Sequence, residues 1–227
     1  MRPVLDRRDM MTGMGVAALA PLLACTREPE ALAASSPVRL IAGNACPLTP
    51  RQTEGPFYFD PRLVRRDIKE GRPGARLRLR LQVVGARDCA PAPRARVDIW
   101  HCDAAGVYSG YDSERSAGEK WLRGAQFADG QGTVAFETVY PGWYEGRATH
   151  IHCKVSTPDG REVTSQIYFP DPLSDQVHAQ SAYRGRAGRR LRNDDDGIFR
   201  QAGGSVPLAR VVRFPAGLDG AVVLALR

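Results

Sequence analysis

The sequence predicts an all-β fold, an antiparallel β-sandwich of the immunoglobulin or transthyretin type with long loops and little helix. Short segments alternate apolar and polar residues, and turn-forming Gly, Pro and Asp residues separate them. Beyond the N-terminal 26 residues, no segment keeps an apolar period of 3.6 residues. Many short strands between turns are typical of sandwiches. The chain has 227 residues, which is enough for one substantial core.

The clearest strand covers residues 75–83. Apolar residues occupy every second position from Leu77 to Val83, and arginines and a glutamine occupy the positions between them. Side chains of a strand point alternately to its two faces, so this segment is expected to bury one face and expose the other.

The other expected strands are shorter. Pro158-Asp159-Gly160 is a strong turn signal and predicts a hairpin between two of them. The polar stretch 171–200 is where we expect any short helix or long loop. The expected strands cover residues 95–102, 133–140, 148–155, 164–169, 208–214 and 220–226.

The N-terminus has the features of an export signal. Arg7-Arg8 precede an uncharged run, 10–26, as in twin-arginine signals. The run includes Leu22-Leu23-Ala24-Cys25, which is typical of a lipoprotein signal, so Cys25 is either lipidated and tethers the chain to a membrane or discarded with an ordinary cleaved signal. We therefore expect residues 1–25 to be the signal and 26–45 a flexible linker. The protein is expected to be exported to the periplasm or cell envelope.

Export changes the interpretation of the cysteines, because disulfides persist in oxidising compartments. Cys46 and Cys89 flank proline-containing loops and are the first candidates for a disulfide. Cys102 and Cys153 lie within expected strands and are interpreted as small buried residues. The sequence leaves the pairing open.

The charge of the chain gives no sign of a nucleic-acid partner. The formal net charge is +7, but the basic residues are spread along the chain, with no basic helix or patch interleaved with aromatic residues. We interpret this charge as a solvated surface.

Two of the four histidines form a His-x-His motif, His150 and His152. On a strand, both imidazoles point to the same face, roughly 6–7 Å apart along the backbone, where one metal ion could contact both. Structural histidines, a zinc site or a cupin-type metalloenzyme are alternatives. A cupin would need a nearby carboxylate and a later histidine, and Glu162 and His178 are poorly placed for these roles. His178 is interpreted as structural, and so is His101.

Four motifs together resemble the intradiol ring-cleavage dioxygenases, in particular their shorter exported members. These non-haem iron enzymes open catechols between the two hydroxyls. The motifs are Asp98-Ile99-Trp100 with Gly106-Val107-Tyr108, Pro141-Gly142-Trp143-Tyr144, Arg147-x-x-His150-Ile151-His152, and Gln166-Ile167-Tyr168-Phe169. Glu54-Gly55-Pro56-Phe57 and Asp196-Gly197-Ile198-Phe199 also resemble family segments.

The resemblance implies that residues 46–227 form an intradiol dioxygenase-like catalytic β-sandwich. It also implies a mononuclear non-haem Fe(III) site with Tyr108, Tyr144, His150 and His152 as ligands. A phenol has a pKa near 10, so only a strongly Lewis-acidic cation holds two tyrosinates at neutral pH. The ferrous facial triad would need a carboxylate, which this motif lacks.

The resemblance implies roles for three residues in the cleavage of a catechol-type aromatic by O₂ to a muconate-type diacid. Tyr144 would be displaced by the substrate and accept a proton from it. Arg147 would stabilise negative charge on the ring, and Gln166 would help to orient the substrate.

Several alternatives remain open at this level. Tyr111 competes with Tyr108, while Tyr140 competes with Tyr144 but fits the core face of its strand. Only five residues separate Tyr144 from His150, fewer than in the catechol and protocatechuate enzymes, which predicts a more open site. The helical dimerisation segment of the catechol enzymes is not expected before Cys46. A non-catalytic, envelope-anchored binding module of the transthyretin type is the alternative function. Substrate and oligomeric state stay open.

Overall fold

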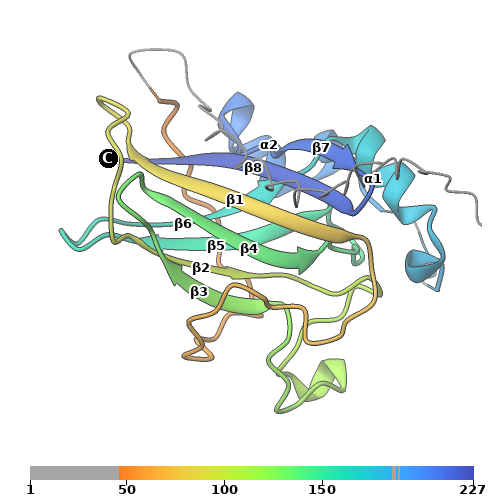
Figure 1. The fold of residues 1–227 in the computed structure, drawn as a ribbon. Helices are drawn as coiled ribbons and strands as arrows, with labels where there is room; N and C mark the ends of the chain where they lie inside the picture. The colour runs from red at the N-terminus through yellow and green to blue at the C-terminus, as the bar shows by residue number, and fades with distance from the viewer. Residues whose placement is uncertain (1–45, 186–187, 189) are drawn as a thin grey trace, which may run out of the picture. The chain divides into compact units, whose positions relative to one another are not determined.

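The computed structural model describes residues 46–185, 188 and 190–227, and this part of the chain folds into two four-stranded β-sheets packed face to face (Figure 1). The expected export signal and linker lie outside the described residues. The first sheet has the order β4-β1-β8-β7 and the second the order β3-β2-β5-β6. The strands are β1 (Arg76–Gly85), β2 (Arg96–Trp100), β3 (Arg123–Phe127), β4 (Thr133–Val139), β5 (His150–Ser156), β6 (Glu162–Tyr168), β7 (Arg210–Phe214) and β8 (Gly217–Leu226).

The predicted all-β sandwich is confirmed, with two differences in its strands. β3 was not predicted, because Arg123 and Gly124 are buried there and give no apolar alternation. The sheets are not wholly antiparallel, since β8 pairs in parallel with β1, from Leu77 opposite Leu218 onwards. Pairing direction depends on how the chain returns from the second sheet, and the alternation of side chains does not encode it.

In the part of the chain that the structure describes, both α-helices lie in the segment that follows β6. The helices are α1 (Asp171–His178) and α2 (Gly197–Gln201), and short 3₁₀ turns cover Asp112–Glu114, Ser181–Tyr183, Asn193–Asp195 and Gly203–Ser205. Within the described ranges, no helix combines the length and apolarity needed to cross a bilayer. The expectation that short helix falls near residues 171–200 is confirmed for the two α-helices, whereas the 3₁₀ turn at Asp112–Glu114 lies outside that range.

The core lies between the sheets and determines where the histidines point. Ile151, Cys153 and Val155 of β5 are 0% exposed and pack into this core. Because successive side chains of a strand alternate, His150 and His152 lie on the opposite, outer face of the second sheet. The candidate site is therefore outside the sandwich core.

The outer face is covered by an N-terminal strap, residues 46–60, drawn in orange in Figure 1. The expected disulfide Cys46–Cys89 is confirmed, with 5.5 Å between the Cα atoms. The backbone N–H of Gln52 donates to Thr164 O of β6 at 2.9 Å, which holds the strap beside the second sheet. Cys102 and Cys153 are buried, as expected.

Candidate metal centre

The two histidines of β5 point at the same place, as predicted. Their Nε2 atoms are 3.1 Å apart, and His150 and His152 are each only 2% exposed. The Nδ1–H of His150 donates to Ala148 O at 2.8 Å, and a carbonyl can only accept. His150 therefore presents an unprotonated Nε2 to the site when its ring is neutral.

Two tyrosines from separate loops meet this pair. Tyr144, in the loop between β4 and β5, places its Oη 3.2 Å from His150 Nε2. Tyr108, in the loop after β2, has its ring centroid 5.7 Å from that of Tyr144 and 6.2 Å from that of His152. The Tyr108 hydroxyl is buried without a hydrogen-bond partner among the described residues. The structure brings the four expected ligands together.

The competing tyrosines and the cupin-type residues have other partners. Tyr111 donates its hydroxyl to Tyr58 O at 3.2 Å, and Tyr140 pairs with Ser174 Oγ at 2.7 Å in the core. His178 Nε2 contacts Pro141 O at 3.1 Å. Glu162 pairs with Lys154 at the far end of β5.

The spacing of the donor atoms fits a single metal ion. Two ligands at right angles on an ion, each at about 2.1 Å, lie about 3.0 Å apart. The separations between the two histidine nitrogens and between Tyr144 Oη and His150 Nε2 are 3.1 and 3.2 Å. No group of three His, Cys, Asp or Glu side chains suited to a metal occurs within the described ranges, so a site here needs the tyrosines.

Burial sets the protonation of the donors. It lowers the pKa of His150 to about 3 and the pKa of His152 well below its usual value, so both rings are neutral ligands at pH 7. Burial, and then the neighbouring Tyr144, raise the pKa of Tyr108 well above 10. Burial also raises the pKa of Tyr144, against the opposing charge of Arg147. The protein alone keeps both phenols protonated, so tyrosinate ligands require a strong cation.

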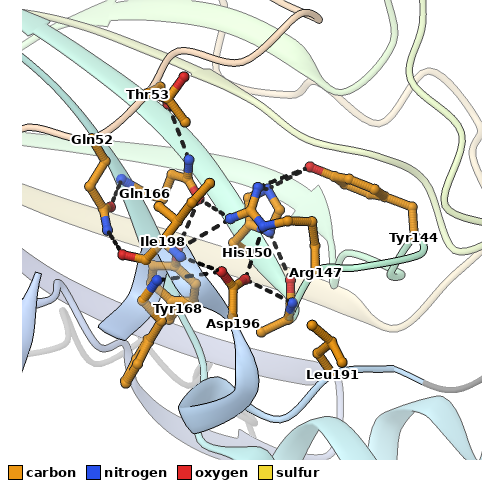
Figure 2. Close-up of polar contacts among 12 residues, drawn as sticks. Gln52, Thr53, Tyr144, Arg147, His150, Gln166, Tyr168, Leu191, Asp196 and Ile198 are labelled. Carbon is orange, nitrogen blue, oxygen red and sulfur yellow. Dashed lines mark hydrogen bonds and ion pairs between the residues drawn. The ribbon is translucent and has the colours of Figure 1, made fainter. Parts of the chain in front are cut away.

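Arg147 lies beside Tyr144 and His150, and every nitrogen of its guanidinium is engaged (Figure 2). Its Nη1 is 3.2 Å from Tyr144 Oη and 3.5 Å from His150 Nε2. Its Nη2 donates to Gln166 Oε1 and, at 3.3 Å, to the Tyr168 hydroxyl. Its Nε donates to Asp196 Oδ2 at 2.9 Å. The guanidinium is thus held with one nitrogen facing the candidate ligands.

Gln166 is anchored on both sides (Figure 2). Its Oε1 accepts from Arg147 and from the Tyr168 hydroxyl, the latter at 3.0 Å, and its Nε2 donates to Thr53 O at 3.1 Å. Its backbone N–H donates to Gln52 Oε1 at 2.9 Å. These contacts join the strap to Arg147.

Three further contacts with the site were not predicted, although their residues lie in the quoted motifs. Trp100 stacks on His152, with ring centroids 4.9 Å apart and an angle of 8° between the planes. Phe57 stacks on Tyr108 at 4.5 Å. Gly55 packs against His152, where a Cβ atom would lie 3.4 Å from Cε1. The strap therefore forms one wall of the site, which only the fold reveals.

A buried arginine connects this wall to the Tyr108 loop. Arg123 is 1% exposed, and its Nη1 donates to Phe57 O at 2.6 Å. Its Nε and Nη2 donate to Ser109 Oγ and Ser109 O, both at 2.8 Å. It belongs to β3, the strand that the sequence did not indicate, so no sequence signal identified it.

Comparison with known proteins finds relatives of this chain. The family model described as Dioxygenase matches residues 53–197. The chain is 31% identical over 173 residues to a catechol 1,2-dioxygenase of Pseudomonas sp. (strain EST1001), covering 64% of this chain and 56% of that protein. It is 28% identical over 205 residues to the catechol 1,2-dioxygenase of Acinetobacter baylyi, covering 77% of this chain and 66% of that one. The chain spans about half the length of the first curated relatives it matches.

Solved structures show the same fold. An intradiol ring-cleavage dioxygenase from Tetranychus urticae matches with a TM-score of 0.74 and 33% identity, over 80% of this chain and 95% of that one. The dioxygenase domain of a carbohydrate-binding fusion protein from Streptomyces sp. SirexAA-E matches with a TM-score of 0.60 and 28% identity, over 79% and 99% of the two chains. Because the family model covers residues 53–197 and these solved structures share the fold, the chain belongs to the intradiol ring-cleavage dioxygenase family.

Proposed function

We propose that this chain is a mononuclear non-haem Fe(III) enzyme that opens a catechol-type ring between its hydroxyls with O₂, giving a muconate-type diacid. The observation that carries the proposal is the convergence of Tyr108, Tyr144, His150 and His152 on one point outside the core. Relatives named catechol 1,2-dioxygenase support a catechol-type substrate. Because the chain spans only part of their length, we propose the substrate class and not a single catechol.

The donor set suits ferric iron. Tyr108, Tyr144, His150 and His152 would hold the ion, and two phenolates with one hydroxide balance its three positive charges, which a buried pocket tolerates. Bound Fe(III) supplies the Lewis acidity that turns phenols and catechol hydroxyls into anions, and the reactivity towards O₂.

The two tyrosines differ in burial, and we assign them different roles on this basis. Tyr108 is 1% exposed and stacked against Phe57, so it is the permanent ligand. Tyr144 is half-buried and accepts a hydrogen bond from Arg147, so its oxygen is the one placed to take a proton from an incoming catechol hydroxyl. The positive charge of Arg147 then favours negative charge on the ring beside it. Gln166 was expected to help orient the substrate, and because its Oε1 accepts from Arg147 we propose that it acts through that side chain.

The ligand assignment is tested by colour. Tyrosinate-bound Fe(III) absorbs visible light by charge transfer, so protein from a host that exports it should be coloured and contain one iron per chain. Tyr108→Phe should abolish or strongly shift this band, whereas Tyr111→Phe should preserve it, because the Tyr111 hydroxyl contacts Tyr58 O. The reverse result would overturn the assignment, and a colourless, iron-free protein would overturn the metal centre.

The reaction is tested by oxygen uptake with a panel of catechols and identification of the product. We expect one O₂ consumed per ring and both oxygen atoms in the diacid. A coloured protein that consumes no O₂ with any catechol would be an iron-binding module, and the enzymatic proposal would fail.

We also propose that the protein is exported, supported by Arg7-Arg8 and the uncharged run 10–26. Replacing both arginines by lysine should retain the protein in the cytoplasm, as measured by cell fractionation. Cys25→Ala tests the tether separately, because loss of membrane association without loss of export would identify Cys25 as the lipid attachment site. Export of the double lysine variant at the normal level would contradict the twin-arginine route.

A further inference from the structure

Asp196 is fully buried, and both of its carboxylate oxygens accept hydrogen bonds. It is 0% exposed, and its Oδ2 accepts from Arg147 Nε and from the backbone N–H of Ala148, both at 2.9 Å (Figure 2). Its Oδ1 accepts from the backbone N–H of Ile198 at 2.8 Å. Burying a carboxylate costs free energy unless the charge is paired and hydrogen-bonded. These partners therefore make the buried position of Asp196 possible.

These contacts determine the direction of the Arg147 side chain. A guanidinium is planar and rigid, so fixing two of its nitrogens fixes the third. Asp196 holds Nε, and Gln166 and Tyr168 hold Nη2. Nη1 is then left directed at Tyr144 Oη, 3.2 Å away.

The same carboxylate oxygen also fixes the backbone that leads into the metal-binding strand. Asp196 Oδ2 accepts from the Ala148 N–H, and the Ala148 carbonyl accepts from His150 Nδ1 at 2.8 Å. One buried atom thus links the orientation of Arg147 to that of His150. No other acidic side chain contacts Arg147 within the described ranges.

We propose that Asp196 is a positioning residue, which holds the Arg147 guanidinium against Tyr144 at the reacting centre. This inference rests on the proposed function of Arg147. Without the carboxylate, the guanidinium is free to turn about its own side chain, and displacement of a catalytic group by about 1 Å costs roughly 100-fold in rate.

The rival role is structural, since Asp196 is also the N-cap residue of α2. Asp196→Ser separates the two roles, because serine is a good N-cap but is too short to replace the second carboxylate oxygen. Asp171→Ser is the matched control. Asp171 also pairs with an arginine, Arg190, and accepts a backbone N–H, that of Asn193 at 3.1 Å, but it has no contact with Arg147.

Kinetics per bound iron give the first test. Asp196→Ser should lower kcat about 100-fold with a smaller change in KM, whereas Asp171→Ser should leave kcat per iron unchanged. In an Arg147→Ala background, Asp196→Ser should cost less than twofold, because residues that act through one another are not additive. An equal loss in both backgrounds, or a loss explained by lower iron content, would overturn the proposal.

A readout independent of turnover gives the second test. In full-length protein loaded with Ga(III), a diamagnetic ion, the Arg147 Nε–H should give an exchange-protected NMR signal that is assigned by its absence in Arg147→Lys. Asp196→Ser should remove this protection and Asp171→Ser should keep it. Protection that survives in Asp196→Ser would overturn the positioning role. If wild-type protein shows the protected signal but no oxygen uptake, the proposed function fails and the contact stands.

Discussion

Trp100 lies flat against the imidazole of His152, with 4.9 Å between the ring centroids and 8° between the planes. The contact follows from the register of the second sheet, in which Trp100 of β2 is directly opposite His152 of β5. Gln166 of β6 is opposite His152 on the other side. Trp100, His152 and Gln166 are thus aligned across three neighbouring strands, and this register fixes the orientation of one candidate ligand, His152.

Trp100→Leu should weaken iron binding about 10-fold or more, because partners that orient a ligand are worth 10–100-fold in metal affinity. It should also cost about 3 kcal/mol of unfolding free energy, as for other large-to-small changes at buried aromatic residues. Iron content after dialysis against a graded chelator measures the first effect.

Trp121→Leu is the control for this prediction. Trp121 is also buried, at 5% exposure, but it packs in a separate cluster with Leu122 and Val139. It should lose comparable stability and keep its iron. Equal loss of iron in the two variants would show that the stacking on His152 has no specific effect.

Gly55 allows a second test of the wall that the strap forms. Its φ is +72°, and a Cβ atom there would lie 3.4 Å from Cε1 of His152. Gly71 has nearly the same φ, +74°, and no atom within 4 Å of such a Cβ. Alanine at either position should cost about 1 kcal/mol through backbone strain. At 3.4 Å the added methyl group of Gly55→Ala makes an ordinary van der Waals contact with His152, so both variants should keep the visible absorption band. A band shifted by Gly55→Ala alone would show that the strap lies closer to His152 than this distance.

Local patterns in the sequence were sufficient for most of the fold. Alternation in β1 and the turn at Pro158-Asp159-Gly160 are properties of neighbouring residues, so they can be read without the structure. β3 was missed because one of its buried residues is Arg123. The N–H groups of this arginine donate to Phe57 and Ser109, which belong to other segments. A buried charge is specified by distant partners, and no local pattern describes them.

The candidate site, too, could be predicted from the sequence only in part. His150 and His152 were predicted to share a face because alternation is local, and Tyr108 and Tyr144 were identified only through family resemblance. Asp196 has no spacing relationship to Arg147, and the two meet because the segment after β6 folds back beside β5. Its role is a property of the tertiary structure.

The disulfide should stabilise the domain without affecting the site. Cys46 and Cys89 are separated by 43 residues, and closing a loop of this length is worth about 4 kcal/mol by the loop-entropy estimate. The bridge packs with Val84 and Ala225. Replacing both cysteines by serine should lower the urea midpoint and leave the visible spectrum unchanged. Reductant should lower the midpoint of the wild-type protein only, and an equal effect on the double-serine variant would show that Cys46–Cys89 is not the bridge that stabilises the domain.

His101 should make stability depend on pH between about 4 and 6.5. Its Nδ1–H donates to Cys102 O at 2.8 Å, and its Nε2 accepts from the Thr138 hydroxyl at 2.7 Å. Burial lowers the pKa of His101 to about 4, whereas the unfolded chain has the ordinary value near 6.5. Between these values the unfolded state binds more protons, so the free energy of unfolding falls as the pH falls, by on the order of 3 kcal/mol over the window.

His101→Gln removes this titration and leaves the other three histidines in place. At pH 7 the variant should be less stable by about 1–3 kcal/mol, because Thr138 and Cys102 lose well-placed partners. As the pH is lowered to 4, the wild-type protein should lose this advantage, so that the two urea curves converge. The contributions of His150, His152 and His178 cancel in the difference between the two proteins. A stability difference that stays constant from pH 7 to pH 4 would mean that His101 is not held neutral by the fold.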